Sequence, residues 1–253
     1  MLAISCLCGT VLEAADDEAL LGVLRAHVSA AHPGVATEVQ LRNLIEAQHR
    51  LAPRRPRVER IGAVEVRPIG PTLLRDWLRF FDHEAFADNP IWASCYCAFN
   101  HLPITQEAWA NRTAAENRDE MSERIACGAQ RGYLAYVDGQ PAGWLNAAPR
   151  SELPHLSRLP VFAIDDPARV GTAACFVIAP PYRKHGLARR LLDAACADFA
   201  DQGLAFAEGF PAKDPQSDGQ AYHGPPALYR AAGFDLVEER GPYLHMRKAL
   251  RPT

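Results

Sequence analysis

The chain has 253 residues, of which 48% are hydrophobic and 23% are charged, and its formal net charge is −3. These values are ordinary for a folded globular protein and argue against extensive disorder. A slightly acidic chain gives no reason to expect a nucleic-acid partner. No apolar run approaches the ~18 residues of a membrane span, so we expect no membrane partner either.

The beginning of the chain carries no basic region, and its apolar stretch is too short for a secretion or lipoprotein signal. Seven cysteines, with two pairs spaced Cys-x-Cys, fit reduced thiols or metal ligands better than a disulfide framework. We therefore expect a cytoplasmic protein. The length has room for one large domain and one small one, and a homodimer is a possible assembly.

A small module is predicted at the front of the chain, over residues 1–51. The alternating run 3–13 suggests a hairpin that turns or bulges at Gly9. A helix follows, capped by Asp16 or Asp17.

A second helix of this module opens with the capping box of Thr37 and Gln40 and ends near Leu51. The next stretch, 52–62, begins with prolines and arginines and has no apolar periodicity. We interpret it as an extended linker to a larger domain over residues 63–250.

The module also holds a group of residues with metal-ligand chemistry: Cys6, Cys8, His27 and His32. Two thiolates on a hairpin and two imidazoles at a helix end would supply the four ligands of a structural zinc site, although Cys-x-Cys is tighter than the usual spacing. Because the module has little core, a metal would contribute much of its folding energy. The layout is similar to a small Cys/His domain family whose metal binding is itself a prediction. The alternative is that the cysteines pack as small hydrophobes and the histidines are solvated.

A strand, a glycine-containing turn and a helix form the most informative segment of the sequence. The apolar run 173–178 ends at a Pro-Pro pair, and the following turn fits the pattern R-x-x-G-x-A, with Arg183, Gly186 and Ala188 at its fixed positions. Small residues let a phosphate approach the main chain, and the first N–H groups of a helix point at it.

Positive charge surrounds this turn, from Arg183, Lys184, Arg189 and Arg190. The helix dipole adds about 0.3–1 kcal/mol for a nearby anion. The turn therefore indicates an anionic cofactor. Taken alone, it could equally be an ordinary strand-to-helix turn with a solvated basic end.

The residues after this helix continue the pattern. A short apolar strand at 204–208 and an irregular stretch lead to a helix at 227–232 that is closed by Gly233, and 235–238 is strand-like. With the turn, these elements resemble the GNAT superfamily of acyl-CoA-dependent N-acetyltransferases over about residues 63–250. The middle of the chain is similar to a GNAT subfamily with a Cys-aromatic-Cys segment, a Gly-Trp strand and a Pro-Arg loop: here Cys95-Tyr96-Cys97, Gly143-Trp144 and Pro149-Arg150.

The elements ahead of the turn fit the same family. We predict a strand at 64–67, a helix at 71–81, a helix at 114–127 that is capped by Thr113, strands at 133–137 and 142–147 that form a hairpin, and a long loop over 150–170. This β-α-α-β-β-β-α-β-α-β order implies an α/β (α+β) fold with a mixed sheet that splays where the cofactor enters.

The resemblance implies acetyl-CoA as the cosubstrate. Its pantetheine arm would pair with the main chain of Phe176, Val177 and Ile178, where an N–H could also polarise the thioester carbonyl. In any sheet, the side chains of Phe176 and Ile178 would be core residues, so only the backbone carries this prediction. The pyrophosphate would lie on the turn, at Arg183, Lys184, His185, Gly186, Leu187, Ala188 and Arg189.

An amine acceptor must lose a proton before it attacks, which costs roughly 4.6 kcal/mol at pH 7 for an alkylamine of pKa ~10.4. Glu208, at the end of the strand beside the cleft, is the carboxylate that we would test first, acting through water. It could equally be a solvated strand-end charge. His101, Tyr96 and His223 are weaker candidates.

Coenzyme A leaves as a thiolate that needs a proton. Tyr229, five residues before Phe234, matches the tyrosine that many GNAT enzymes aim at the sulfur. Because a phenol near pKa ~10 delivers a proton to a thiolate near ~8.5 at a cost of about 2 kcal/mol, hydrogen bonding would be most of its role. A Tyr229 that only packs is the alternative.

The segment Cys95-Tyr96-Cys97 could supply a nucleophilic cysteine or, with His101, a second metal site. No base and orienting group are evident beside it, and the alternation of residues 92–99 favours a half-buried strand or a wall of the acceptor pocket.

The leading hypothesis is thus an N-acetyltransferase for a primary amine of a small molecule or an amino terminus. A regulatory protein that senses acyl-CoA without turnover is the alternative. The acceptor pocket is expected among residues 77–112, 149–160 and 211–226, where loops vary most.

Overall fold

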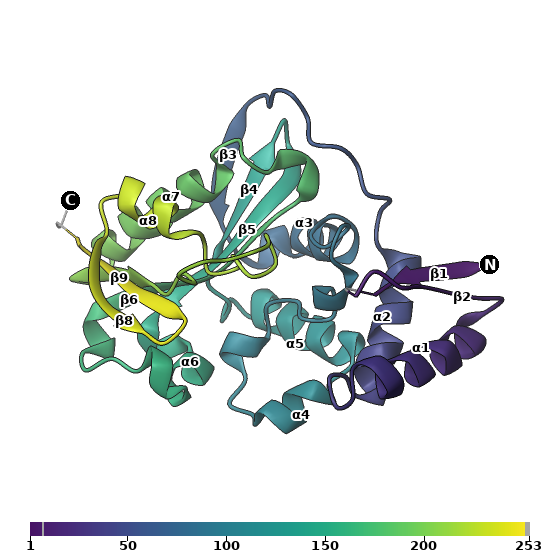
Figure 1. Ribbon diagram of the computed structural model, residues 1–253. Helices are drawn as coiled ribbons and strands as arrows, with labels where there is room; N and C mark the ends of the chain where they lie inside the picture. Colours follow the sequence, from purple (N-terminus) through teal and green to yellow (C-terminus); the bar gives the residue numbers. More distant parts are fainter. Residues whose placement is uncertain (7, 251–253) are drawn as a thin grey trace.

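The computed structural model describes residues 1–6 and 8–250. The larger of its two sheets has seven strands in the order β3-β4-β5-β6-β7-β9-β8 (Figure 1). Neighbouring strands are antiparallel except β6 and β7, which are parallel, so the predicted mixed sheet is confirmed. The strands are β3 (Val64–Pro68), β4 (Tyr133–Val137), β5 (Gln140–Pro149), β6 (Val170–Ile178), β7 (Phe206–Gly209), β8 (Asp235–Arg240) and β9 (Tyr243–Ala249).

Helices cover both faces of this sheet. On one face, α7 (Leu187–Asp201) and α8 (Pro226–Ala231) bury an apolar side that includes Leu191 and Phe199. Phe199 packs so closely on β6 that a Cβ at Gly171 would lie 2.2 Å from its ring, which explains the glycine there. On the other face lie α3 (Leu74–Arg79), α5 (Ala114–Ala126) and α6 (Pro154–Arg158), with α4 (Gln106–Ala110) beside α5.

The sheet splays between β6 and β7, as expected. The two strands pair only from Val170 with Phe206 to Ala173 with Gly209, and then β7 ends while β6 continues to Ile178. A bulge in the pairing of β5 with β6 falls at Asn146 and Ala147, directly opposite the point of divergence. The second half of β6 therefore presents an edge that β7 does not cover.

The structure differs from the predicted elements in three places. β9 was not predicted, and it lies between β7 and β8, which makes β8 the sheet edge. The helix expected over 71–81 is broken into a 3-10 turn, α3 and a π-helical turn over Phe80–Glu84. The expected long loop 150–170 contains α6 and short 3-10 turns.

The front of the chain folds as predicted into the hairpin β1 (Leu2–Ser5) and β2 (Val11–Ala14) and the helices α1 (Asp17–Ala31) and α2 (Glu38–Arg50). The Asp16 side chain caps α1, and both hydrogen bonds of the Thr37–Gln40 capping box are formed. These elements share a small apolar core of their own: Ile4, Leu12, Leu20, Leu21, Leu24, Leu41 and Ile45.

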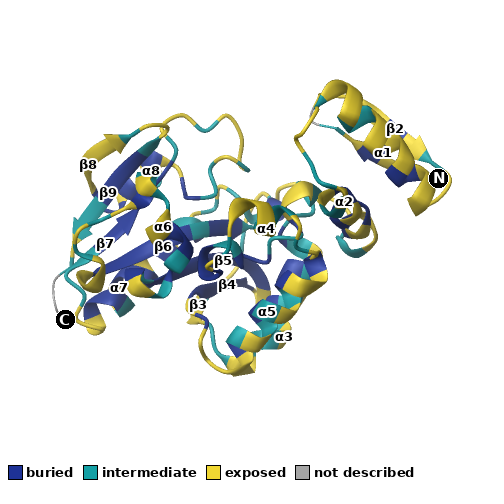
Figure 2. Cartoon of the chain, turned by 90° about the horizontal axis from the view of Figure 1, so that it is seen from below, coloured by how far each residue is buried: buried dark blue, intermediate teal, exposed yellow. Residues whose placement is uncertain are grey.

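Helix α2 connects this part to the rest of the molecule. In Figures 1 and 2 it lies between α1 and the body that contains α4 and α5. Asn43 of α2 is buried, donates from Nδ2 to the carbonyl of Arg112 at 2.9 Å and accepts at Oδ1 from the amide of Ala114 at 2.9 Å, at the start of α5. Arg50 donates to the carbonyls of Phe81, Asp82 and Ala93. The module thus has its own apolar core, and hydrogen bonds from α2 attach it to the rest of the molecule.

None of the helices in the described residues is both long and apolar enough to cross a lipid bilayer.

Candidate active site and metal centre

The predicted phosphate turn lies at the N-terminus of α7. Gly186 caps the helix with φ +82°, a left-handed conformation that favours glycine, and a Cβ there would meet no atom within 4 Å. Within the part of the chain that the structure describes, no acceptor bonds the amides of Gly186, Leu187 and Ala188. A helix start with free amides and an open approach is suited to an anion.

The basic side chains of this turn already have partners. Arg183 donates from Nε to the carbonyl of Ile178 at 3.0 Å and pairs with Asp88 at 2.6 Å and with Asp218 at 3.1 Å. The Lys184 ammonium lies 3.9 Å from Asp218. The guanidinium of Arg183 is thus held at the end of β6 by two carboxylates.

The other polar residues of the turn point elsewhere. The Nε2 atom of His185 lies 2.9 Å from the carbonyl of Val58, in the predicted linker. The Val58 amide in turn donates to the carbonyl of Pro181 at 3.0 Å. Arg189 pairs with Asp193 one helical turn on, at 2.8 Å. The linker stretch is therefore attached to the turn.

The edge of β6 that β7 leaves unpaired is also bonded. The amide of Phe176 donates to the carbonyl of Tyr222 at 2.7 Å, and the ring of Phe176 meets that of Tyr229 edge to face. Val177 and Ile178 continue the strand toward the turn. The edge residues and the turn thus form one continuous surface from β6 to α7.

Glu208 is fully buried, so a solvated strand-end charge does not describe it. Its Oε1 atom accepts from the hydroxyl of Thr172 at 2.8 Å and from Arg150 at 3.2 Å, and its Oε2 atom lies 2.9 Å from Nε2 of His245. Arg247 is 3.8 Å away. Burial lowers the pKa of Arg150, although the carboxylate of Glu208 opposes that shift. Glu208 thus belongs to a buried ionic network on the sheet face opposite α7.

Tyr229 lies where β6 and β7 diverge. It is completely buried, and its hydroxyl donates to the carbonyl of His223 at 2.7 Å. A Cβ on Gly209, the last residue of β7, would lie 2.3 Å from the hydroxyl oxygen, so only glycine admits the ring. Burial raises the pKa of Tyr229 well above its usual value and keeps the phenol protonated.

The three weaker candidates are buried as well. Tyr96 donates to Asp82 at 2.7 Å, His101 lies among Asn146 and Gln130, and the Nδ1 atom of His223 lies 2.6 Å from the carbonyl of Ala174. Burial lowers the pKa of His101 and that of His223 to about 4. Both histidines are therefore neutral near pH 7.

The predicted strand through Cys95-Tyr96-Cys97 is wrong. The segment is a turn in which Tyr96 and Cys97 have φ of 45° and 54°, so the residue alternation reflects burial of single side chains rather than a strand. The sulfur of Cys97 lies 3.8 Å from that of Cys175 on β6, a neighbour that the sequence did not indicate. The bond to Cys175 and burial raise the pKa of Cys97, and burial raises that of Cys95 to about 12. Neutral thiols are poor nucleophiles.

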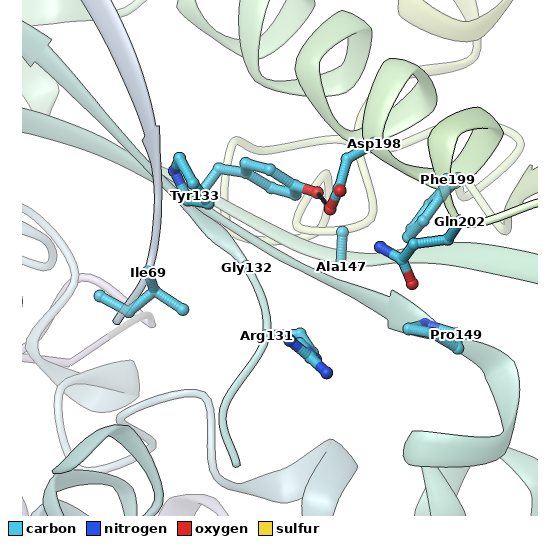
Figure 3. Close-up of a pocket in the computed structure, with 10 residues that line it drawn as sticks. Ile69, Arg131, Gly132, Tyr133, Ala147, Pro149, Asp198, Phe199 and Gln202 are labelled. Carbon is cyan, nitrogen blue, oxygen red and sulfur yellow. Dashed lines mark hydrogen bonds between the residues drawn. The ribbon is translucent and has the colours of Figure 1, made fainter. Parts of the chain in front are cut away.

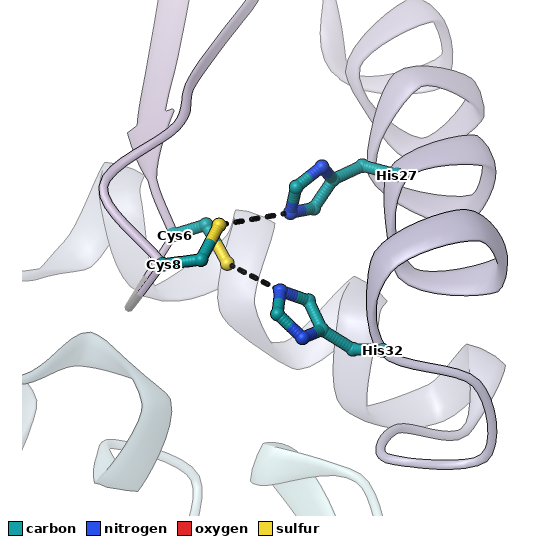
Figure 4. Close-up of side chains that lie close together, drawn as sticks. All are labelled: Cys6, Cys8, His27 and His32. Carbon is teal, nitrogen blue, oxygen red and sulfur yellow. Dashed lines mark hydrogen bonds between the residues drawn. The ribbon is translucent and has the colours of Figure 1, made fainter.

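The four predicted metal ligands meet in the N-terminal module (Figure 4). Their ligand atoms all lie within 4.8 Å of one another, with Cys6 Sγ 3.4 Å from His32 Nε2 and Cys8 Sγ 3.5 Å from His27 Nε2. Zn–S and Zn–N bonds of ~2.3 and ~2.0 Å at a tetrahedral angle separate S and N by about 3.5 Å. Hydrogen bonds, the largest from Thr10, lower the pKa of Cys8 to about 5, which favours the thiolate. The donor set and spacing fit a divalent metal of the zinc type.

A small pocket lies at the opposite end of the sheet from the turn, where Tyr133 donates a hydrogen bond to Asp198 of α7 (Figure 3). Its lining includes Arg131 and Gln202 but none of the predicted site residues.

Sequence comparison finds that residues 102–218 match the model of the Acetyltransferase (GNAT) family. No curated protein shows significant similarity to the chain. Solved structures with a similar fold include the PaiA N-acetyltransferase of Thermoplasma acidophilum in complex with coenzyme A, with 14% identity, coverage of 74% of this chain and 99% of that chain, and a TM-score of 0.44.

Two further structures are similar at the same level. The putative acetyltransferase yncA of Salmonella typhimurium, with acetyl-CoA as its cofactor, has 13% identity, coverage of 76% and 96%, and a TM-score of 0.44. The ribosomal-protein-alanine N-acetyltransferase of Brucella melitensis has 16% identity, coverage of 74% and 99%, and a TM-score of 0.43. The segment of the chain that is similar to the GNAT acetyltransferase family, residues 102–218, thus includes β4 to β7 and α7.

Proposed function

We propose that the protein transfers an acetyl group from acetyl-CoA to a primary amine of a small molecule or an amino terminus, by direct attack of the amine on the thioester. The observation that carries this proposal is the strand edge of β6 that leads into the free amides at the start of α7. A pantetheine arm needs main-chain partners in an extended segment, and a pyrophosphate needs a helix N-terminus directly after it.

Cofactor binding is assigned to two groups of residues. The amides of Gly186, Leu187 and Ala188 and the nearby cations Arg183, Lys184, His185 and Arg189 would take the pyrophosphate. The main chain of Phe176, Val177 and Ile178 would take the pantetheine, and the Phe176 amide would donate to the thioester oxygen, where charge develops as the amine attacks. No metal is needed for this binding.

Tyr229 is proposed to hydrogen-bond the departing thiolate. Its hydroxyl lies at the point of divergence of β6 and β7, where the reacting end of the cofactor would lie. Because burial raises the pKa of this phenol, full proton transfer costs more than the ~2 kcal/mol of an unperturbed pair. Stabilisation by a hydrogen bond is then its main contribution.

Glu208 is proposed as the group that accepts the amine proton, through water. Both of its oxygens have partners, so it would take a proton only by weakening its contact with Arg150 or His245. Proton transfer to Glu208 therefore requires a local rearrangement of these contacts.

The Cys/His module, residues 1–51, is proposed to bind one structural zinc ion through Cys6, Cys8, His27 and His32. Such an ion would fix the hairpin of β1 and β2 against the end of α1. We propose the stretch 52–62 as the linker and residues 63–250 as the catalytic domain. The full chain and a chain starting near Arg57 should then bind acetyl-CoA alike.

An acetyl-transfer assay across an amine panel tests the proposed activity. Formation of acetylated amine with release of free thiol is the expected outcome, and mass spectrometry of the products identifies the acceptor. Binding of acetyl-CoA without turnover of any amine would favour the alternative, an acyl-CoA sensor.

A further inference from the structure

The connection between β7 and α8 runs back to the cofactor surface (Figure 1). Residues 217–224 of this connection, here called the strap, contact both parts of the surface assigned above to acetyl-CoA. These contacts involve the strand edge, the phosphate turn and Tyr229.

At the strand edge, the strap makes the bonds that a pantetheine arm would make. The carbonyl of Tyr222 accepts from the Phe176 amide at 2.7 Å, and His223 Nδ1 donates to the carbonyl of Ala174 at 2.6 Å. The Phe176 amide is the donor assigned to the thioester oxygen. A main-chain carbonyl of the protein thus occupies the position of the carbonyl of the substrate.

At the phosphate turn, the strap supplies an anion. The carboxylate of Asp218 lies 3.1 Å from the guanidinium of Arg183 and 3.9 Å from the ammonium of Lys184. These are cations that the pyrophosphate would otherwise attract. A negative charge of the strap therefore competes with the negative charge of the cofactor for the same partners.

At the reacting end, the strap engages the proposed proton donor. The hydroxyl of Tyr229 donates to the carbonyl of His223, and in this arrangement it has no proton to offer a thiolate. Removal of the strap would leave the hydroxyl without its acceptor and free to bond the sulfur. Cofactor entry and activation of Tyr229 are then one event.

The strap is held across the cleft by side-chain packing. The ring of Tyr222 lies 6.1 Å from that of Trp92, and a Cβ at Gly219 would lie 2.8 Å from the amide nitrogen of Asn89. Gly224, the last residue of the strap, has φ +82° and is followed by Pro225 before α8 begins, so a rotation at the glycine could release the strap without unwinding the helix.

We infer that residues 217–224 are a self-occluding strap that imitates acyl-CoA, with Tyr222 in the place of the thioester carbonyl and Asp218 in the place of the pyrophosphate, and that acyl-CoA binds by displacing it. This inference rests on the proposed function. It predicts that the apparent Kd for the cofactor equals the Kd of the open form divided by the fraction of molecules in which the strap is open.

Calorimetry with acetyl-CoA on the full chain tests the competition. Asp218→Asn removes the competing charge, and we expect acetyl-CoA to bind about two- to five-fold more tightly, as for loss of one partly exposed ion pair. The matched control is Asp214→Asn, an exposed carboxylate in the same connection without an ion pair to the turn. Equal affinities of the two variants would overturn the inference.

Hydrogen exchange of the wild-type full chain, with and without acetyl-CoA, supplies a second readout. The amides of Ala221 and Gly224, which are bonded within the closed strap, should exchange faster when acetyl-CoA is bound, while α7 becomes more protected. Slower exchange of both would mean that the segment closes over the cofactor, and the inference would be wrong. If acetyl-CoA does not bind at all or if Gly186→Glu leaves its affinity unchanged, the proposed function fails instead.

Discussion

The two predicted sites of this protein differ in what surrounds them. In the N-terminal module, the four metal-ligand atoms lie within 4.8 Å of one another. Each cysteine sulfur lies next to a histidine nitrogen, as two ligands of the same ion would. At the predicted cofactor site, the residues also lie close together, but Arg183, Phe176 and Tyr229 each bond another part of the chain. A metal ion can therefore bind the first site without rearrangement. Acetyl-CoA can bind the second only after the groups that would contact it have broken their present hydrogen bonds and ion pairs.

Metal removal tests the predicted zinc site and should have the largest effect on local stability. Elemental analysis should find about one zinc per chain, and chelation should unfold the module, because structural zinc sites contribute apparent binding energies of about 10–16 kcal/mol in small zinc-finger peptides. Cys8→Ser should lose the metal, whereas Cys127→Ser, a change of another exposed thiol, should keep it. Hydrogen exchange of residues 1–51 measures the unfolding. Well under one metal per chain with the module still folded would remove the zinc site.

Tyr229→Phe tests the predicted cofactor site, at the reacting end of the cleft. It removes one hydroxyl and almost no volume, so we expect kcat to fall about 10²–10³-fold, as for loss of one hydrogen-bond donor to developing charge, with acetyl-CoA affinity nearly intact. If the hydroxyl only bonds His223, the loss is one of stability, about 0.5–1.5 kcal/mol, and thermal unfolding reports it. Wild-type kcat in the variant across about pH 6 to 9 would show that water or another group protonates the thiolate.

Gly186→Glu addresses the anion site of the cleft. The side chain would bring a negative charge to the free amides at the start of α7 and would occupy a left-handed conformation that favours glycine. We expect acetyl-CoA affinity to fall about 100-fold or more by calorimetry. Gly203→Glu is the matched control, since Gly203 has φ +77° and open space at the other end of the same helix. Unchanged affinity in Gly186→Glu would place the phosphate elsewhere.

Much of this structure could be predicted because it depends on short stretches of sequence. The capping box at Thr37, the helix cap at Thr113 and the R-x-x-G-x-A turn each involve residues only a few positions apart. The four metal ligands are farther apart, with 26 positions between Cys6 and His32, but they all come from the hairpin and from the helix that follows it, including its end. Local spacing sets local geometry, and the structure has these elements where the sequence placed them.

The parts that were missed depend on residues far apart in the sequence. Glu208 was expected at a strand end beside the cleft, but Arg150 and His245, 58 and 37 positions away, enclose it in a buried network. The turn at Cys95-Tyr96-Cys97 is fixed by packing against β6, where Cys175 lies. No periodicity in the sequence reports such neighbours, because they arise only when the sheet is assembled.

The pH dependence of stability should also separate the two regions. In the cleft region, burial lowers the pKa of His101 and that of His223 to about 4, below the ~6.5 of an unfolded histidine. The unfolded chain therefore binds more protons in acid than the folded chain does. The contribution of these two histidines to the free energy of unfolding is complete above about pH 6.5 and is lost as the pH falls toward 4. Between pH 7 and 5 the cost is about 2 kcal/mol for each histidine.

Urea unfolding of the full chain at the two pH values measures this loss. His101→Gln should reduce it by about 2 kcal/mol, whatever the variant does to stability at pH 7. Asn111→Ala, which changes an exposed side chain and removes no titratable group, serves as the control and should leave the loss unchanged. An identical pH dependence in His101→Gln and the wild type would mean that His101 is not held neutral by burial.

Asn43 tests whether the two regions are independent. Both ends of its amide bond the segment that starts α5, at 2.9 Å each, so Asn43→Ala leaves the carbonyl of Arg112 and the amide of Ala114 without these partners. We expect a loss of about 1–3 kcal/mol in the unfolding of the catalytic part, because buried groups that lose their hydrogen bonds keep their desolvation cost. Asn111→Ala, which removes one local bond from an exposed side chain, should cost less than 1 kcal/mol.

If Asn43→Ala destabilises residues 1–51 alone in hydrogen exchange, the module is a separable domain. If α5 and the π-helical turn beside Arg50 lose protection with it, the module supports the wall of the cleft, and a chain that starts near Arg57 would lack that support.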